Sequence, residues 1–215
     1  PEKGIIPPGL FIPLAEQTSL ISDIGRIVIQ QTAKQIKKWN QMGFNNICVS
    51  VNVVAQQLRR GQLLIDLDEA IKANEISGDS LELEITESSL IENSETVKKL
   101  LQEIKSRHIN ISLDDFGTGF SALQYLIKYP IDRIKIDRLF INNILTDKKR
   151  QTIVQSITEM AHRLSIGVLA EGVDSQAEIE YLQQLGCDYV QGYGFSKPMS
   201  SQQTTQWLMQ RFTQV

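Results

Sequence analysis

INISLDDFGTGF, residues 109–120, is the stretch from which the rest of the chain is best interpreted. Apolar residues at every second position of 109–113 follow the two-residue period of a strand, which we expect to stop at Asp114 and Asp115. Two glycines follow the acids, so the backbone can turn tightly around whatever the carboxylates hold. The pattern is typical of a metal site at a strand end. An acidic strand end that only caps the following helix is the alternative, which the remaining chain must decide.

The length, composition and charge favour one compact domain without a basic face for binding nucleic acid. The chain has 215 residues, of which 41% are hydrophobic, enough for a substantial core. The net charge is −3 with a pI near 5.5, and the lysines and arginines are spread along the chain. This argues against DNA as a partner, whereas a small phosphorylated ligand remains compatible if bound cations reverse the local field.

The expected compartment is the cytoplasm. Cys48 and Cys187 lie far apart in apolar surroundings, so we expect two buried thiols in a reducing environment. No apolar run approaches the roughly 18 residues of a membrane span, and no signal peptide is present. Because the first residue is Pro1, we expect this chain to be a piece of a longer protein. A membrane-anchored protein of which this chain is the cytoplasmic part fits that expectation.

Strands and helices are expected to alternate along the chain. The strands are predicted at 47–53, 81–86, 109–113, 132–137, 165–173 and 187–195. The helices are predicted at 22–41, 63–74, from Ser94, at 121–129, between 137 and 165 with a break near 146–150, from the capping box Ser175-x-x-Glu178, and around Trp207. The opening residues 1–17 contain four prolines and are expected to be irregular.

The alternation predicts a parallel sheet with helical crossovers. No Gly-x-Gly-x-x-Gly follows the first strand, so a dinucleotide-binding fold lacks its main support. A closed barrel needs eight units and typically about 250 residues. We therefore predict an α/β fold, a modified TIM-type (β/α)8 barrel with about six of its eight units present, the others lying before Pro1.

Polar residues stand at or beside the carboxyl end of every predicted strand. They are Asn52, Glu84, the pair Asp114 and Asp115, the pair Lys135 and Asp137, Glu171, and Gln191. In a barrel these ends form the face on which active sites are built. The acids and the amide offer only oxygen ligands, which suit Mg²⁺ or Mn²⁺ and suit Zn²⁺ poorly.

Adjacent acids allow a carboxylate to bridge two metal ions, the arrangement that assists phosphate-ester hydrolysis. Near such ions the pKa of Lys135 would tend to fall, so that it orients or deprotonates the attacking water, or neutralises phosphate charge. A structural counter-ion to the acids is an equally good interpretation of this lysine. An enolase-like enzyme, with Lys135 removing a proton beside one Mg²⁺, also accounts for it but leaves the tandem acids unexplained.

Seven stretches together resemble the EAL domain family of bacterial cyclic di-GMP phosphodiesterases, which have a modified (β/α)8 barrel. They are FIPLAE (11–16), VNV with QQL (51–58), LELEITES (81–88), LDDFGTGFSAL (113–123), IKID (134–137), AEGV (170–173) and CDYVQGYGFSKP (187–198). The resemblance runs from about Gly9 to the C-terminus in the family's order. It implies hydrolysis of cyclic di-GMP to linear pGpG with two ions of Mg²⁺ or Mn²⁺.

The resemblance also assigns roles to individual residues. It implies metal ligation by Asn52, Glu84 and the bridging Asp114, and it places Asp115 and Glu171 around the second metal.

The remaining roles concern water, substrate and a loop. The resemblance implies that Lys135 acts on the attacking water beside an essential Asp137, and that Gln191 lies near the substrate. Glu87 would support the loop after Asp115, including Gly117, Gly119 and Phe120, which the family uses to couple dimerisation to metal binding. A homodimer, and sensory or GGDEF-type domains upstream, are likewise implied.

The chain departs from the family pattern in three places. Asn-Leu-Ser is Asn52-Val53-Val54 here, and Tyr-Ser-Ser is Phe120-Ser121-Ala122. The name-giving Glu-Ala-Leu, with its metal-binding glutamate, is absent. We therefore expect a single EAL-type domain over 1–215 that lacks its N-terminal portion and is nearly inactive alone. A degenerate module that binds cyclic di-GMP or a protein without hydrolysis is the alternative function.

Overall fold

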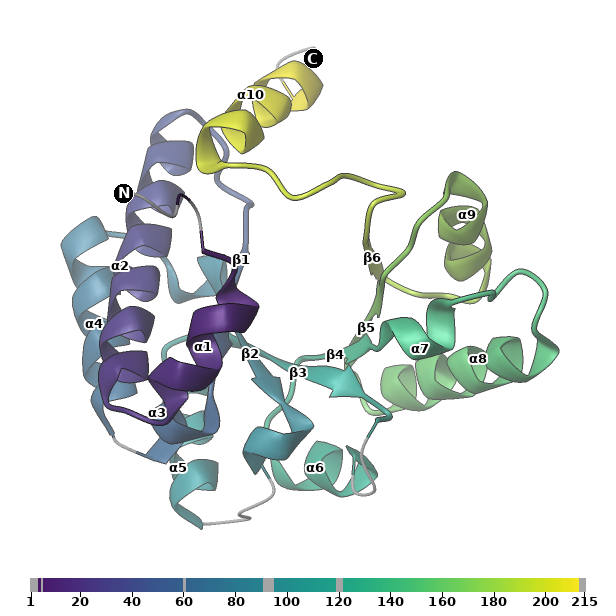
Figure 1. Cartoon of the computed structure of the whole chain (residues 1–215), viewed down its shortest axis with the longest axis horizontal. Coiled ribbons are helices and arrows are strands. Elements are labelled where there is room, and N and C mark those ends of the chain that lie inside the picture. Colours follow the sequence, from purple (N-terminus) through teal and green to yellow (C-terminus); the bar gives the residue numbers. More distant parts are fainter. Residues whose placement is uncertain (1–3, 5, 60, 91–94, 119–121, 213–215) are drawn as a thin grey trace. The chain divides into compact units, whose positions relative to one another are not determined.

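Six strands follow one another in the sheet in the order of the sequence, β1-β2-β3-β4-β5-β6 (Figure 1). The structure, a computed structural model, describes residues 4, 6–59, 61–90, 95–118 and 122–212. The strands are β1 (Val49–Val53), β2 (Leu81–Thr86), β3 (Asn110–Phe116), β4 (Arg133–Ile136), β5 (Gly167–Glu171) and β6 (Tyr189–Gln191). β3 to β6 pair in parallel. The predicted α/β class with six successive strand–helix units is confirmed.

The chain divides into two units, each described by itself. The first comprises 1–83 with 89–109, and the second comprises 84–88 with 110–215, so β2 begins in one and ends in the other. The first unit holds α1 (Pro8–Glu16), α2 (Leu20–Gln41), α3 (Ala55–Arg59), α4 (Gln62–Asn74) and α5 (Glu95–Lys105). The second holds α6 (Ala122–Lys128), α7 (Arg138–Ile141), α8 (Lys148–Arg163), α9 (Gln176–Gln184) and α10 (Ser201–Phe212).

Local sequence signals explain where several helices start. The predicted capping box is present: the Ser175 hydroxyl accepts from the Glu178 N–H, and the Glu178 carboxylate accepts from the Ser175 N–H. Asp147 caps α8 by accepting from the N–H groups of Lys149 and Arg150. These caps satisfy amides that would otherwise lack partners, so both helices begin at defined positions.

The core of the strands is apolar and fully buried. In β2, Leu81, Leu83 and Ile85 are completely inaccessible to solvent, and in β3 the same holds for Ile111 and Leu113. Because side chains alternate across a strand, burial of these residues directs the intervening side chains of β2 and β3 to the opposite face. Glu84 and Asp114 are among those intervening residues, so the apolar pattern itself places them.

Two aspartates that precede strands bind the neighbouring strand. Asp132, just before β4, accepts a hydrogen bond of 2.8 Å from the Ile111 N–H of β3. Asp188, just before β6, accepts one of 2.8 Å from the Val168 N–H of β5. Asp132 lies three residues before Lys135, and Asp188 lies three residues before Gln191. The two hydrogen bonds therefore help to fix the strand register that brings these two site residues to the other end of the sheet.

The expectations for the opening residues and for the last strand were wrong. The opening is not irregular throughout, since α1 occupies Pro8–Glu16. Pro8 stands in the first turn, where its missing N–H costs nothing and its fixed backbone angle suits a helix. β6 is shorter than predicted, whereas the break between α7 and α8, at 142–147, lies near the charged run 146–150 as predicted. Ser94, predicted to open a helix, lies outside the described residues; α5 begins at Glu95.

The strand predicted at 109–113 does not stop at the acid pair. β3 continues through Asp114 and Asp115 to Phe116, and its register with β4 shifts between Leu113 and Phe116. Asp115 has a positive φ of 55°, an uncommon conformation that aspartate tolerates better than most residues. The irregularity turns the two adjacent carboxylates away from simple alternation, as bulges near functional sites do.

The expectation of two buried thiols was also wrong. Cys48 is exposed, and Cys187 is partly exposed. None of the described helices is long and apolar enough to cross a membrane.

Candidate functional site

Lys135 lies at the centre of the candidate site. This β4 lysine is 2% exposed and its ammonium contacts one carboxylate from each of three other strands. Its Nζ lies 2.7 Å from Glu171 Oε1 of β5, and 3.0 Å from both Glu84 Oε2 of β2 and Asp114 Oδ1 of β3. All four residues belong to the second unit. Strands far apart in the sequence therefore deliver their polar ends to one point.

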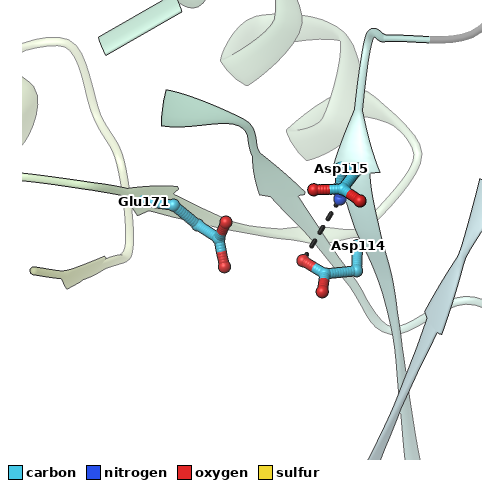
Figure 2. Close-up of side chains that lie close together, drawn as sticks. All are labelled: Asp114, Asp115 and Glu171. Atoms are coloured by element: carbon cyan, nitrogen blue, oxygen red, sulfur yellow. Dashed lines mark hydrogen bonds between the residues drawn. The ribbon is translucent and has the colours of Figure 1, made fainter. Parts of the chain in front are cut away.

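A carboxylate cluster surrounds this contact. One ligand oxygen from each of Asp114, Asp115 and Glu171 lies within 4.8 Å of the others, and all three residues are partly buried. Figure 2 shows Asp114 and Asp115 on β3, with the Asp114 and Glu171 carboxylates facing each other. The Asp115 N–H donates to Asp114 Oδ1 at 3.1 Å, which orients the Asp114 side chain. Glu84 joins the cluster through Lys135 and is 9% exposed.

Burial and, after it, neighbouring negative charge perturb the ionisation of the cluster. Burial, followed by the charges of Asp114 and Asp137 and a hydrogen bond with Asp137, raises the pKa of Asp115 above its usual value. Burial likewise raises the pKa of Glu171, although the ion pair with Lys135 opposes it. The acids thus outnumber the one ammonium that compensates them, as expected of a site that also receives cations.

The pKa of Lys135 moves upward in this structure. Burial alone would lower it, but the hydrogen bond with Glu171 and the charges of Glu84, Asp114 and Glu171 outweigh burial and raise the pKa. The fall expected from the sequence presupposes neighbouring metal ions. Without them, Lys135 is a protonated counter-ion, the other role considered for it above.

The other predicted residues of the second unit lie at the ends of β2, β4 and β6. Asp137 follows β4 and caps α7, accepting from the Leu139 N–H at 2.7 Å. Gln191 is the exposed last residue of β6 and pairs in register with Glu171. The 6%-exposed Glu87 accepts a 2.8 Å hydrogen bond from the Gly117 N–H. This contact ties Glu87 to the start of the loop after β3; Gly119 and Phe120 of that loop lie outside the described residues.

Asn52 is the one predicted ligand that lies in the first unit. It is exposed on β1, whereas all other predicted site residues are in the second unit. Its role as a ligand stays a prediction from the sequence.

The donor set fits a hard divalent cation. Every ligand group in the cluster is a carboxylate oxygen, and neither histidine nor cysteine takes part. Mg²⁺ and Mn²⁺ prefer such oxygens, and a divalent ion would offset both the burial and the like charges that raise the pKa of Asp115 and Glu171.

Two contacts near the site were not anticipated from the sequence. Arg138 and Phe140 of α7 pack against the residues that follow Glu171 and Phe116 respectively. Their position just after the predicted site residue Asp137 could have suggested that they lie near the site. Packing against loops distant in the sequence, however, leaves no periodic pattern from which the contacts could be predicted.

Comparison with known proteins gives a consistent family. Residues 1–198 match the EAL domain. The signalling protein YkoW of Bacillus subtilis is 38% identical over 100% of this chain, and the cyclic di-GMP phosphodiesterase PdeR of Escherichia coli is 37% identical over 96% of it. These matches cover 27% and 31% of the relatives, so the chain spans about a quarter to a third of their length.

Solved structures show the same fold. The structure of the MucR phosphodiesterase in complex with c-di-GMP is 35% identical, with a TM-score of 0.88 over 95% of this chain and 83% of that one. The EAL enzyme Bd1971, with cAMP and cyclic-di-GMP bound, is 32% identical, with a TM-score of 0.90 over 97% of this chain and 57% of that one.

Proposed function

This chain belongs to the EAL domain family, and from that premise we propose that it hydrolyses one phosphodiester bond of cyclic di-GMP to give linear pGpG. Relatives named as cyclic di-GMP phosphodiesterases support the substrate class. The single observation that carries the proposal is the buried ammonium of Lys135 between carboxylates of three strands. A module without catalytic demand has no evident need to bury such a charge cluster, which is costly to desolvate.

We propose two ions, Mg²⁺ or Mn²⁺, held by Asn52, Glu84, Asp114, Asp115 and Glu171. The proximity of the Asp114, Asp115 and Glu171 oxygens supports this set. When bound, such ions polarise the phosphate and lower the pKa of water.

Lys135 acts on the attacking water in this proposal. Its ammonium can donate a hydrogen bond that orients the water, and its neutral amine can accept the water's proton. In the cation-free site the surrounding carboxylates raise its pKa, so proton acceptance requires that these charges are first neutralised. The neighbouring Asp137 holds the chain after Lys135 by capping α7, and Gln191 contacts substrate from the end of β6.

The proposal includes the setting of the domain. We infer one EAL-type domain that forms a homodimer in the cytoplasm, within a longer protein that carries sensory or GGDEF-type domains upstream. Relatives named as a signalling protein and an oxygen sensor, of which the chain spans only 27% and 26%, support a multidomain parent.

The test is to supply cyclic di-GMP and Mn²⁺ to the chain within its parent protein and to follow pGpG by chromatography. We expect turnover that Asp114→Asn and Lys135→Ala reduce at least about a thousandfold, because each removes a group acting at the reacting phosphate. Lys149→Ala, which removes an exposed lysine, is the matched control. Tight binding of cyclic di-GMP without product would instead identify a binding module.

A further inference from the structure

The short helix α7 contacts the loop after β5, the strand that ends at Glu171. A methyl group built on Gly172, the next residue, would lie only 2.4 Å from Cγ of Arg138 and 2.8 Å from its Cβ. Gly172 also has a positive φ of 67°, which suits glycine. The aliphatic part of Arg138 therefore lies directly on the backbone that follows Glu171 and limits where that carboxylate can move.

The same helix contacts the loop after β3. A methyl group on Gly117 would lie 2.9 Å from the ring of Phe140, and Gly117 has a φ of 96°. Gly117 is the residue whose N–H donates to Glu87, and it stands two residues after Asp115. Phe140 thus closes one side of the segment that Glu87 binds from another.

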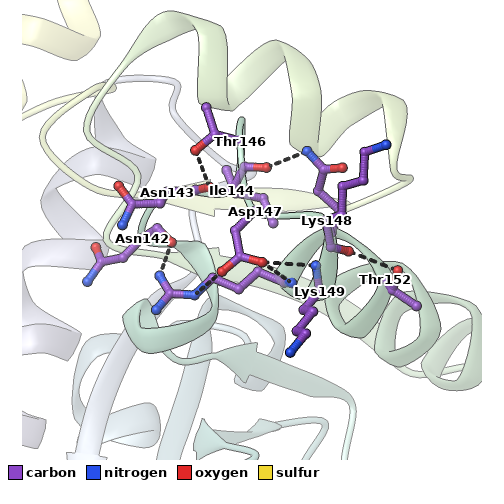
Figure 3. A network of polar contacts seen from close by, with 10 residues as sticks. Asn142, Asn143, Ile144, Thr146, Asp147, Lys148, Lys149 and Thr152 are labelled. Atoms are coloured by element: carbon purple, nitrogen blue, oxygen red, sulfur yellow. Dashed lines mark hydrogen bonds and ion pairs between the residues drawn. The ribbon is translucent and has the colours of Figure 1, made fainter.

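α7 is itself anchored to α8 through the connecting residues 142–147 (Figure 3). The Arg150 guanidinium donates to the Asn142 carbonyl and lies 3.4 Å from Asp147 Oδ2. The Gln151 amide donates to the Ile144 carbonyl at 2.8 Å. Ile144 is completely buried, so both a polar and an apolar anchor hold the connection.

We propose that α7 is a positioning element for the cation site: held by α8 through Arg150, it presses Arg138 on the loop after β5 and Phe140 on the loop after β3. That the restraint serves a cation site rests on the proposed function. That α7 restrains the two loops can be tested independently of hydrolysis.

The contact of the Arg138 stem is the important one. The guanidinium lies 3.0 Å from Asp174, but the two side chains are 62% and 49% exposed, and exposed ion pairs contribute little. Arg138→Met, which keeps a long apolar stem, should therefore bind Mn²⁺ nearly as the wild type does. Arg138→Ala should bind it about tenfold more weakly, as when a residue that holds a metal ligand in place is lost.

The decisive experiment uses Arg150, which touches neither loop in the contacts described here. In the parent protein we would compare Arg150→Ala with Lys149→Ala, an exposed neighbour of equal charge. Hydrogen exchange without metal should accelerate about tenfold at the Gly117 and Val173 amides in Arg150→Ala only. Calorimetry should show Mn²⁺ affinity falling about tenfold in the same variant.

Phe140 supplies an independent check against Leu139, which is 63% exposed on the same helix. Phe140→Ala should accelerate exchange at Gly117 and leave Val173 protected, whereas Leu139→Ala should change neither. Thermal melts identify a variant that fails to fold, and Arg150→Lys then replaces Arg150→Ala. Unchanged exchange and Mn²⁺ affinity in folded Arg150 and Arg138 variants would overturn the inference. Altered exchange without any cyclic di-GMP hydrolysis would contradict only the proposed function.

Discussion

At the scale of single residues, Lys135 and the acids around it form one electrostatic unit. The Lys135 side chain is 3% exposed and its ammonium lies within 3.0 Å of three carboxylates, so water solvates these four charged groups poorly. Removing one member of a buried ion pair leaves uncompensated charge. The residue is thus expected to matter for stability as well as for chemistry.

We expect Lys135→Met to lower the free energy of unfolding by about 3 kcal/mol at neutral pH, measured by urea unfolding with a chelator present. Because the folded pKa of Lys135 is raised, its contribution is complete below the unfolded lysine value near pH ~10.4 and is lost as pH rises through the folded value. Lys149→Met is the control. An equal loss in both variants would contradict a compensating role for Lys135.

Asp115 provides a second prediction because burial and the charges of Asp114 and Asp137 raise its pKa. Its ionised form therefore destabilises the fold, fully above the folded pKa and not at all below the unfolded value of about 3.9. Asp115→Asn should raise the melting temperature of the cation-free protein by about 2 °C at pH 7, with no gain near pH 3. Asp115→Ala should be less stable than Asp115→Asn, since asparagine tolerates the φ of 55° better. A destabilised Asp115→Asn would show that the ionised Asp115 carboxylate does not destabilise the fold.

At the scale of elements, the segments after β5 and β6 form a backbone pair. The Val173 N–H donates to the Gln191 carbonyl at 3.1 Å, and the Gly194 N–H donates to the Val173 carbonyl at 2.8 Å. A methyl group on Gly192 would lie 2.2 Å from the Val173 oxygen. Glycine is needed because only a bare backbone allows this approach, which holds the ends carrying Glu171 and Gln191 together.

Gly192→Ala is expected to destabilise the protein by about 1–3 kcal/mol more than Gly43→Ala, measured by chemical unfolding. Gly192 and Gly43 both have a positive φ, of 156° and 92°. A methyl group on Gly43 would meet only open space, so the comparison isolates the steric clash at Gly192. Similar losses in the two variants would mean that the backbone pair adjusts without cost.

At the scale of the whole molecule, the site concentrates acids in a chain of net charge −3. Ligands that bind only the folded state stabilise it in proportion to the logarithm of their concentration. Cation binding should therefore be visible in global unfolding, without any assay of activity.

We expect Mn²⁺ at a hundred times its dissociation constant to stabilise the protein by about 2.7 kcal/mol, a shift of about 5–10 °C in melting temperature. The shift should vanish in Asp114→Asn and persist in Asp79→Asn, which removes an exposed acid outside the cluster.

Ca²⁺ should bind but inhibit hydrolysis, since its longer and looser coordination suits the site poorly. Equal shifts in both variants, or equal turnover with Ca²⁺ and Mg²⁺, would contradict the site as described.

The sequence by itself determined the order of the strands, the family and the alternation of side chains along the strands. β2 spans the predicted 81–86, because alternation along a strand is a local property that one stretch displays in full. The polar strand ends were visible for the same reason, and the family match rests on stretches of contiguous residues.

Only the tertiary structure decided which side chains meet and how the backbone bends to let them. That β3 continues past the acid pair with Asp115 at positive φ, that Lys135 holds Glu84, Asp114 and Glu171 together, and that α7 rests on Gly117 and Gly172 all depend on segments distant in sequence. Such contacts arise from packing and charge balance among several elements, and no periodicity within one element records them.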